Sequence, residues 1–457
     1  MGQNFCVDQP LLKRLAGYCR LDEKDVVLEI GAGLGFLTSI LAEKAGQVLA
    51  VELDASLVKV LEDRFRDHVN VRVIRANALR LPSLVFHKVV SNPPYNISSP
   101  LLSELLGWRF SCATLTLQRE FTEKLAAASG TKEYGPVRVL AEYRGEIHVL
   151  ENVPRSAFYP QPRVQSAVIR IEPLPSPSFH VKDEEVFRWL IRSLFTQRRR
   201  KTRSGLQLFL RDRAGAGKNE MATLLETFTH LDTRVYELSP SEFGELANRA
   251  ADLVRGKRLE YCGHVFYVFP EVYEPSDDSE LIARHLTVTP GQRILDMGTG
   301  CGLLGVLAAL REGVVTAVDI NSVAVECSTL NARINRVSDR FKAHFSDLFG
   351  SLGCERYDLV VFNPPYLPED EDDARDGLLE KAWRGGRSGS EVIERFLVGV
   401  DDHLSPDGQV IIVLSSLSRP EKCVADFERH GFIVEVVEKL RLDFEELTLV
   451  RAWKSIL

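Results

Sequence analysis

Short apolar runs recur along the chain, and two stretches arrange them with glycines and acids in the same order. Residues 26–36 read VVLEIGAGLGF and residues 293–303 read RILDMGTGCGL. Each has the form of a β-strand, a glycine-rich turn and the start of a helix. A second apolar strand follows and ends in an acid, Glu52 in the first stretch and Asp319 in the second. The order strand, turn, helix, strand predicts an α/β unit in each stretch.

Both stretches continue with a third strand and then with a fourth strand that ends in Asn-Pro-Pro-Tyr. This tetrapeptide occupies residues 92–95 and 363–366. Four features therefore repeat in order over about 65 residues, which indicates a duplicated fold. We expect two Rossmann-like α/β domains in tandem, each with strands that alternate with helices in a parallel sheet.

The region between the two stretches has a different pattern. Residues 173–182 are rich in proline and serine, and residues 183–250 have apolar positions at helical spacing without strand alternation. The pattern predicts three domains: a first α/β domain over 1–175, a small helical domain over 176–255 and a second α/β domain over 256–457.

Composition and cysteine usage limit the class of protein. The chain of 457 residues is 45% apolar and 26% charged, which is typical of a globular protein. No apolar run approaches the ~18–20 residues that cross a bilayer, and no signal segment opens the chain. The eight cysteines form no CxxC pair. We expect a cytoplasmic protein with reduced thiols, no metal site and no membrane partner.

The charge differs between the two halves. Residues 1–256 carry a formal net charge of +5 and residues 257–457 carry −12, which together give the −7 of the whole chain. A polyanion such as RNA is attracted to the first half and repelled by the second. Two solvated surfaces of different charge are the simpler interpretation, so the asymmetry only suggests different partners.

The glycine turns are suited to a nucleoside cofactor. Backbone approaches a ligand closely at such a turn, and an acid at the end of the next strand accepts hydrogen bonds from ribose hydroxyls. The dinucleotide motif GxGxxG fails in both copies, because Phe36 and Leu303 occupy its sixth position. No P-loop lysine is present. Together with the downstream tetrapeptide, the pattern indicates S-adenosylmethionine.

The Asn-Pro-Pro-Tyr motif has a chemical reason. An adenine or carboxamide NH2 group is a poor nucleophile because its lone pair is delocalised. The asparagine oxygen and the first proline carbonyl both accept hydrogen bonds from that group and hold its nitrogen in line with a methyl donor. The tyrosine ring stacks on the flat substrate. The predicted catalytic residues are Asn92, Pro93, Tyr95, Asn363, Pro364 and Tyr366.

The first half carries six motifs spread over its length. These are GQNF (2–5), LEIGAGLG (28–35), VELD (51–54), NPPYNISSP (92–100), FYPQPRVQSAVIRIEP (158–173) and FTQRRRKTR (195–203). With these motifs residues 1–252 resemble the KsgA-type rRNA adenine dimethyltransferases. The resemblance implies double methylation of the exocyclic amines of two adjacent adenosines near the 3′ end of small-subunit rRNA, with the rRNA or a pre-ribosomal subunit as partner.

The resemblance also implies site residues, with three departures from the family pattern. Asn77 replaces a usual aspartate, Cys6 replaces a usual leucine, and the sequence begins at GQNF without the short basic segment that usually precedes it. The implied cofactor contacts are Gln3, Asn4, Cys6, Gly31, Gly33, Glu52, Asn77 and Asn92.

A basic run lies in the predicted helical domain. It comprises Arg198, Arg199, Arg200, Lys201 and Arg203. Phosphate contacts to RNA and a solvated cationic helix face are about equally plausible from the pattern alone. The resemblance favours RNA contact.

The second half carries a further set of motifs. These are VYEPSDDSELI (272–282), LDMGTGCGLLG (295–305), VDIN (318–321), SDLF (346–349), FNPPYLP (362–368) and AWRGGRSGSEVIERFL (382–397). On these motifs residues 257–457 resemble the HemK-like glutamine methyltransferases, most closely the type that modifies a class-1 release factor. The implied cofactor contacts are Ser279, Gly298, Gly300, Asp319, Asp347 and Asn363.

The combined interpretation is a bifunctional methyltransferase with S-adenosylmethionine as cofactor. Its expected partners are rRNA for the first half, a peptide chain release factor for the second, and a small activator protein such as this family often uses. Two alternatives stay open. The second half methylates an RNA base, because the motif accepts adenine as readily as a carboxamide, or the first half acts mainly as a ribosome-assembly factor.

Overall fold

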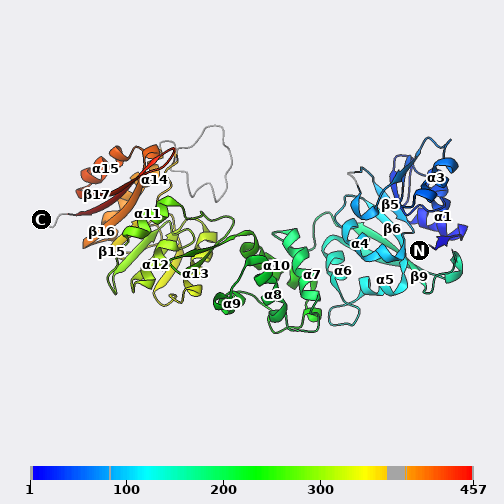
Figure 1. Cartoon of the computed structure of the whole chain (residues 1–457), viewed down its shortest axis with the longest axis horizontal. Helices are drawn as coiled ribbons and strands as arrows, with labels where there is room; N and C mark the ends of the chain where they lie inside the picture. The colour runs from blue at the N-terminus through cyan, green and yellow to red at the C-terminus, as the bar shows by residue number, and fades with distance from the viewer. Residues whose placement is uncertain (1–3, 82–83, 368–385, 387–388, 455–457) are drawn as a thin grey trace. The chain divides into compact units, whose positions relative to one another are not determined.

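The computed structural model describes residues 4–81, 84–367, 386 and 389–454 (Figure 1). The chain forms two compact units. The first consists of Met1–Leu206 and Thr229–Asn248, and the second of Gln207–Phe228 and Arg249–Leu457. Each unit contains one seven-stranded sheet.

The first sheet has the strand order β4-β3-β2-β5-β6-β9-β7. The neighbouring strands from β4 to β6 pair in parallel, whereas β9 is antiparallel to both β6 and β7. The strands are β2 (Val26–Ile30), β3 (Gln47–Glu52), β4 (Val71–Arg75), β5 (Lys88–Ser91), β6 (Cys112–Gln118), β7 (Gly145–Val153) and β9 (Ser166–Pro173).

Helices cover both faces of this sheet because its strands are apolar on both sides. On one face, α1 (Gln9–Tyr18) and α2 (Phe36–Ala42) pack against buried residues of the sheet such as Val27 and Val48. Helix α3 (Ala55–Arg64) lies on the same face, because its Leu61 packs with Ala50, which is two residues from Val48 along β3. The connection from β5 to β6 runs across the sheet in the opposite direction, so the helix that follows β5 lies on the other face. The remaining helices of this region are α4 (Ser98–Leu105), α5 (Arg119–Ala126) and α6 (Pro136–Arg144).

The region between the sheets is helical, as its apolar spacing predicts. The helices are α7 (Glu184–Phe195), α8 (Thr202–Ala214), α9 (Lys218–Leu225) and α10 (Pro240–Arg255). The boundary between the two compact units falls within α8 and within α10. The three-domain division at residues 175 and 255 therefore stays a prediction.

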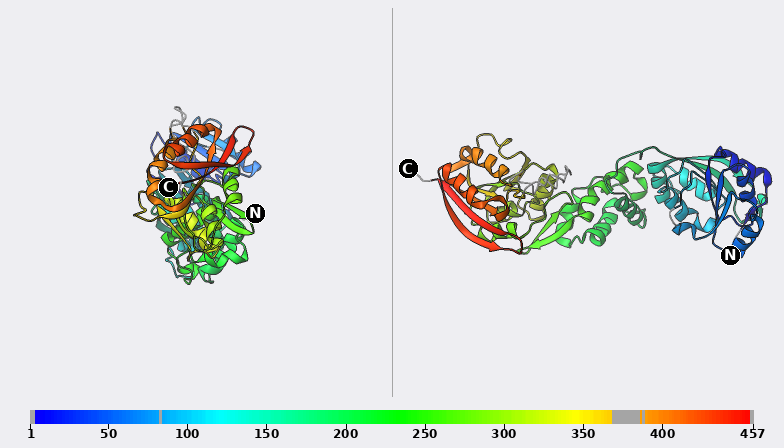
Figure 2. Two further views of the ribbon diagram at one scale, coloured as in Figure 1. Left: turned by 90° about the vertical axis from the view of Figure 1, so that its left-hand side faces the viewer. Right: turned by 90° about the horizontal axis from the view of Figure 1, so that it is seen from above.

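The second sheet repeats the first, with the order β14-β13-β12-β15-β16-β18-β17. Strands β17 and β18 form a long antiparallel ribbon, coloured red in Figure 2. The strands are β12 (Arg293–Met297), β13 (Val314–Asp319), β14 (Phe341–Phe345), β15 (Tyr357–Phe362), β16 (Leu404–Ser415), β17 (Phe432–Arg441) and β18 (Glu446–Lys454).

The helices of the second unit also lie on both faces of its sheet. Residues of α14 (Glu391–Val400) and α15 (Pro420–Arg429) belong to the main core cluster with the sheet, and Figure 1 shows α12 and α13 on the opposite side. A hairpin precedes the sheet. Its strands and the other helices are β10 (Lys257–Tyr261), β11 (His264–Val268), α11 (Asp277–His285), α12 (Leu303–Leu310) and α13 (Ser322–Ile334).

The two sheets confirm the prediction of tandem Rossmann-like domains. The expectation of a parallel sheet holds only in part, because β9 in the first sheet and β18 in the second run antiparallel to their neighbours. In both, the first strand of the repeat, β2 or β12, lies between the second strand and the fourth. The chain crosses to opposite sides at this point, which leaves a crevice at the carboxyl ends of these central strands. The glycine turns and the Asn-Pro-Pro-Tyr motifs both follow these ends.

Candidate active sites

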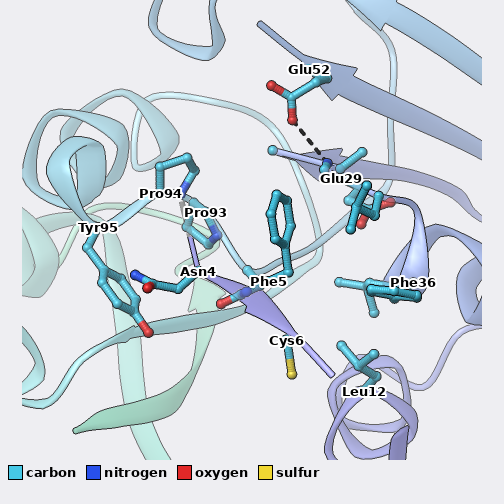
Figure 3. A pocket seen from close by; sticks show the side chains of 16 residues that line it. Asn4, Phe5, Cys6, Leu12, Glu29, Phe36, Glu52, Pro93, Pro94 and Tyr95 are labelled. Atoms are coloured by element: carbon cyan, nitrogen blue, oxygen red, sulfur yellow. Dashed lines mark hydrogen bonds between the residues drawn. The ribbon is translucent and has the colours of Figure 1, made fainter. Parts of the chain in front are cut away.

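The carboxylate of Glu52, the last residue of β3, holds the first glycine turn. Its Oε2 accepts a hydrogen bond from the backbone N–H of Gly33 at 3.0 Å, drawn as a dashed line in Figure 3. Its Oε1 accepts from the N–H groups of Leu53 at 2.8 Å and Asp54 at 3.0 Å. A carboxylate has about four lone-pair sites, so this buried group still accepts a further hydrogen bond from a ligand hydroxyl.

Asp319 at the end of β13 repeats this arrangement. Its Oδ2 accepts from the N–H of Gly300 at 2.9 Å, and its Oδ1 accepts from the N–H of Asn321 at 2.9 Å. Burial raises the pKa of Asp319, while these backbone donors oppose that rise. The predicted pairing of glycine turn and acid is thus present in both units.

Two further acids, Glu29 and Asp296, precede the glycine turns and support them through hydrogen bonds within the protein. The hydroxyl of Thr38 donates to Glu29 at 2.6 Å, and burial raises the pKa of Glu29 to about 8. Asp296 accepts from the Thr299 hydroxyl at 2.5 Å and the Gly305 N–H at 3.0 Å, and burial raises its pKa to about 6. Each acid fastens its turn to the following helix.

The first Asn-Pro-Pro-Tyr motif lies directly against the glycine turn. A Cβ on Gly31 would lie 2.9 Å from Cδ of Pro94, so only a glycine fits there. Asn92 follows β5, and its side-chain oxygen is buried without a hydrogen-bond partner. The Tyr95 hydroxyl lies 2.6 Å from Oγ of Ser166. An orphaned acceptor at the crevice is what a substrate N–H requires.

The N-terminal segment closes the same pocket. Strand β1 (Phe5–Cys6) pairs with β8 (Phe158–Tyr159), and the Phe5 ring packs on Gly33. Figure 3 shows Asn4 beside Pro93 and Tyr95. Gln3 lies outside the described residues. The residues that line the pocket include Asn4, Phe5, Cys6, Glu29, Gly31, Gly33, Glu52, Asn92, Pro93 and Tyr95.

The second motif has a different set of supporting contacts. Asn363 follows β15, and its side-chain oxygen is also buried without a partner, while its Nδ2 donates to Oγ of Ser279 at 3.2 Å. The hydroxyl of Tyr366 donates to the buried carboxylate of Asp278 at 3.3 Å, as does that of Tyr273 at 3.0 Å. Burial is the main cause that raises the pKa of both tyrosines.

Other predicted cofactor contacts already have protein partners. The Asn77 side chain accepts from the Leu79 N–H at 3.0 Å and caps a short 3-10 helix. Asp347 forms an ion pair with Arg395 at 2.7 Å. A Cβ on Gly298 would lie 3.6 Å from the Phe362 ring and 3.9 Å from the backbone oxygen of Asn363, so the second glycine turn also lies beside its motif. Their roles toward a cofactor stay predictions.

The basic run does not form one helical face. Arg198 lies in the turn between α7 and α8 and donates to the backbone oxygens of Lys132 at 2.6 Å and Thr131 at 3.0 Å. Lys201 pairs with Asp232 at 2.8 Å. Arg199, Arg200 and Arg203 are exposed. The structure therefore separates an anchoring arginine from three exposed cations.

Several functional candidates are missing from the sequence prediction. Ser166 lies inside a quoted motif, and Tyr273 and Asp278 lie inside another, but spacing alone does not show that their side chains meet the two tyrosines. The pairing of β6 with β9 brings Ser166 to Tyr95, and the start of α11 brings Asp278 to Tyr366, where Tyr273 donates to the same carboxylate.

The residues in both crevices fit S-adenosylmethionine. Each crevice combines a carboxylate suited to ribose hydroxyls with an orphaned asparagine oxygen suited to the methyl-accepting N–H group. No helix among the described residues is long and apolar enough to cross a membrane.

Comparisons with known proteins agree with this geometry. A family model described as ribosomal RNA adenine dimethylase matches residues 1–250, and one described as methyltransferase small domain matches residues 273–438. A Methanococcoides burtonii protein described as probable ribosomal RNA small subunit methyltransferase A is 40% identical over 250 residues, which cover 54% of this chain and 90% of that protein. A Thermococcus gammatolerans protein of the same description is 36% identical over 242 residues, covering 53% and 85%.

Among solved structures, an E. cuniculi Mtq2-Trm112 complex described as methylating the eRF1 termination factor is 25% identical. It covers 40% of this chain and 99% of that chain, with a TM-score of 0.32. A likeness at this TM-score assigns no activity to the second unit.

The chain is thus an S-adenosylmethionine-dependent methyltransferase with two methyltransferase domains, the second of them a small methyltransferase domain. The match over more than half of the chain, together with the identity to its relatives, decides the family. The chain belongs to the ribosomal RNA adenine dimethylase family.

Proposed function

We propose that the chain is a bifunctional enzyme of the translation apparatus. The first half dimethylates the exocyclic amines of two adjacent adenosines near the 3′ end of small-subunit rRNA. The second half methylates a glutamine side chain of a peptide chain release factor. The observation that carries this proposal is the presence of an orphaned, buried asparagine oxygen at each crevice, Asn92 Oδ1 and Asn363 Oδ1.

Both sites use the same chemistry. When bound, S-adenosylmethionine supplies a methyl group on a positively charged sulfur. The asparagine oxygen and the backbone oxygen of the following proline, Pro93 or Pro364, accept the two hydrogen bonds of a flat NH2 group and fix its direction of attack. Neither site requires a strong base, because the nitrogen loses its proton to solvent after the bond has formed.

The first site is suited to an adenine ring. The Tyr95 ring lies edge-to-face with Phe158, with their centroids 6.4 Å apart, and Tyr159 next to it is exposed. Such aromatic groups give an extruded base a surface on which to lie. The exposed cations Arg199, Arg200 and Arg203 are the proposed phosphate contacts.

The second site is suited to a peptide amide rather than to a base of a nucleic acid. Asp278 places a buried carboxylate beside the Tyr366 hydroxyl, and Glu445 lies close enough to affect the same tyrosine. This negative field and the net charge of −12 over residues 257–457 repel a phosphate backbone. A neutral glutamine side chain meets no such repulsion. A small activator protein remains a proposed partner.

The test uses the unmodified chain, Asn92→Ala and Asn363→Ala with labelled cofactor, immature small subunits and release factor. We expect label in RNA to require Asn92 and label in protein to require Asn363. Each variant serves as the control for the other, because the second activity reports that the chain is folded. Label in RNA that disappears with Asn363→Ala would show that the second half methylates a base. Tight binding to subunits without RNA label would indicate an assembly factor.

A further inference from the structure

The second active site contains a continuous hydrogen-bonded path that ends at the motif asparagine. The carboxylate of Asp278 accepts from the Ser279 hydroxyl at 3.1 Å and from the Ser279 N–H at 2.5 Å. The Ser279 oxygen in turn accepts from Nδ2 of Asn363 at 3.2 Å. Asp278 and Ser279 are 2% and 6% exposed, so water does not compete for these contacts.

The hydrogen bonds of this path can be arranged in only one donor-to-acceptor order. A serine hydroxyl has a single proton, and a carboxylate accepts but does not donate. Because the Ser279 proton points to Asp278, its oxygen offers a lone pair toward Asn363. That lone pair requires the NH2 end of the Asn363 carboxamide. The oxygen end of the carboxamide is thereby turned away from Ser279 and left without a protein partner.

We propose that Asp278 and Ser279 are positioning residues that fix which end of the Asn363 carboxamide faces the methyl acceptor. Without them, the carboxamide turns over at little cost and presents an NH2 group, which repels the N–H groups of the acceptor. Asp278 at the same time holds the Tyr366 hydroxyl, so one buried carboxylate orients two members of the motif. This inference rests on the proposed function in one respect, which is that the methyl acceptor is a glutamine side chain.

Among the described residues of the first site, no hydrogen-bonded path links the motif asparagine to a carboxylate. There the motif tyrosine, Tyr95, is held by the neutral hydroxyl of Ser166 at 2.6 Å. The two sites of one chain therefore differ in the groups behind the same tetrapeptide. This difference makes the first activity an internal control for the second.

The first experiment measures methyl transfer to release factor by the full chain. We expect Ser279→Ala to lower kcat about 10- to 100-fold with little change in KM, because the acceptor still binds but is badly oriented. Ser279→Thr keeps a hydroxyl and rescues the loss. Asp278→Ala also releases the Tyr366 hydroxyl and lowers kcat at least as much, and the double variant is no worse than Asp278→Ala alone, because both substitutions break the same path to Asn363. Ser351→Ala, which removes an exposed hydroxyl, is the matched control.

The second experiment needs no acceptor. The chain is labelled with 15N-asparagine, and the Asn363 side-chain amide is assigned by its loss in Asn363→Ala. In the unmodified chain and in Ser279→Thr, we expect the Asn363 amide protons to exchange with water at least about tenfold more slowly than those of exposed Asn96. In Ser279→Ala we expect this difference to disappear. A failure of the unmodified chain to label release factor would overturn the proposed function while leaving this measurement valid.

Two results would overturn the positioning role. One is an unchanged Asn363 amide signal and unchanged kcat in Ser279→Ala. The other is a loss in Ser279→Ala that calorimetry with S-adenosylhomocysteine explains entirely by weaker binding. That second result would make Ser279 the cofactor contact that the sequence resemblance implies. rRNA labelling by the first site of the same variants checks that the chain is folded.

Discussion

At the scale of single residues, buried acids have two distinct roles at each glycine turn. Glu52 and Asp319 bind the turns through backbone N–H groups and keep capacity for a ligand. Glu29 and Asp296 instead accept from hydroxyl or backbone donors of the turn and the following helix, and burial raises the pKa of both. The motif shows an acid at each position, but only the structure shows which groups each acid contacts.

Glu29→Gln is expected to reduce the pH dependence of stability. Burial raises the pKa of Glu29 from 4.5 to about 8, so the folded state binds a proton that the unfolded state releases. Its contribution is fully present below about pH 4.5 and is lost as the pH rises through about 8, by at most ~1.4 kcal/mol per pH unit. Glutamine keeps an oxygen for Thr38 and has no charge to bury. Thermal unfolding between pH 5 and 8.5 measures the effect, and Glu43→Gln, at an exposed position, is the control. Parallel curves for Glu29→Gln and the unmodified chain would contradict it.

Glu52→Gln is expected to weaken cofactor binding at the first site alone. A hydrogen bond to a charged group contributes about 1.5–3 kcal/mol, which corresponds to about a 10- to 100-fold change in affinity. Calorimetric titration of the full chain with S-adenosylhomocysteine is expected to give two tight sites, and one in the variant. Asp319→Asn is the mirror control, since it should remove the other site. Two unaltered sites in Glu52→Gln would refute the assignment.

At the scale of elements, each helix after a glycine turn begins at a glycine in the left-handed region. Gly35 precedes α2 with φ +80°, and Gly302 precedes α12 with φ +83°. A side chain at Gly35 would lie 2.6 Å from the Phe65 ring. The short turn therefore depends on backbone freedom and on close packing together.

Gly35→Ala is expected to lower the free energy of unfolding of the first unit by about 2–4 kcal/mol. This total is the sum of two costs: about 1–2 kcal/mol of strain from an alanine in the left-handed region, and the overpacking of its Cβ against the Phe65 ring. Gly130→Ala is the matched control, because Gly130 has φ +86° but nothing within 4 Å of the added Cβ. It should show the strain alone. Denaturant unfolding measures both, and equal losses would show that packing at Gly35 contributes nothing.

Arg198 and Arg199 in the turn between α7 and α8 are expected to have different roles, the first in stabilising the fold and the second in binding RNA. Arg198→Ala removes two hydrogen bonds to backbone oxygens and should lower stability by about 1–3 kcal/mol. Arg199→Ala, one residue away and exposed, should leave stability unchanged and weaken binding to rRNA. Thermal unfolding and a filter-binding titration distinguish the two. Equal effects of both variants on RNA affinity with no loss of stability would argue against the division.

At the scale of the whole molecule, the two halves of the chain, which contain one sheet each of the same topology, carry opposite net charge. Residues 1–256 sum to +5 and residues 257–457 to −12. The duplicated sheet gives both units the same crevice, so the surface charge and the groups behind the motif are what separate their substrates.

The charge difference predicts different salt responses of the two activities. If Arg199, Arg200 and Arg203 neutralise three phosphates, a slope of about −0.7 to −0.9 per phosphate lowers RNA affinity more than tenfold between 50 and 200 mM salt. The second activity should change little. Initial rates of RNA and protein labelling at subsaturating substrate measure this in one sample. Equal salt sensitivity would argue against phosphate contacts in the first half alone.

The sequence by itself determined the duplicated fold, the glycine turns, the acids Glu52 and Asp319 that end the second strand of each repeat, and the two tetrapeptides. All of these are local patterns, in which strand alternation, glycine spacing and motif order are visible without knowledge of distant contacts.

Only the tertiary structure decided which side chains support those motifs. Ser166 meets Tyr95 through the pairing of β6 with β9, Asp278 meets Tyr366 from α11, and Arg198 meets a backbone turn far from it in the chain. Such contacts depend on how separate elements pack, and packing brings together residues whose sequence separation carries no signal. The difference between the two active sites is therefore a tertiary property built on a duplicated sequence pattern.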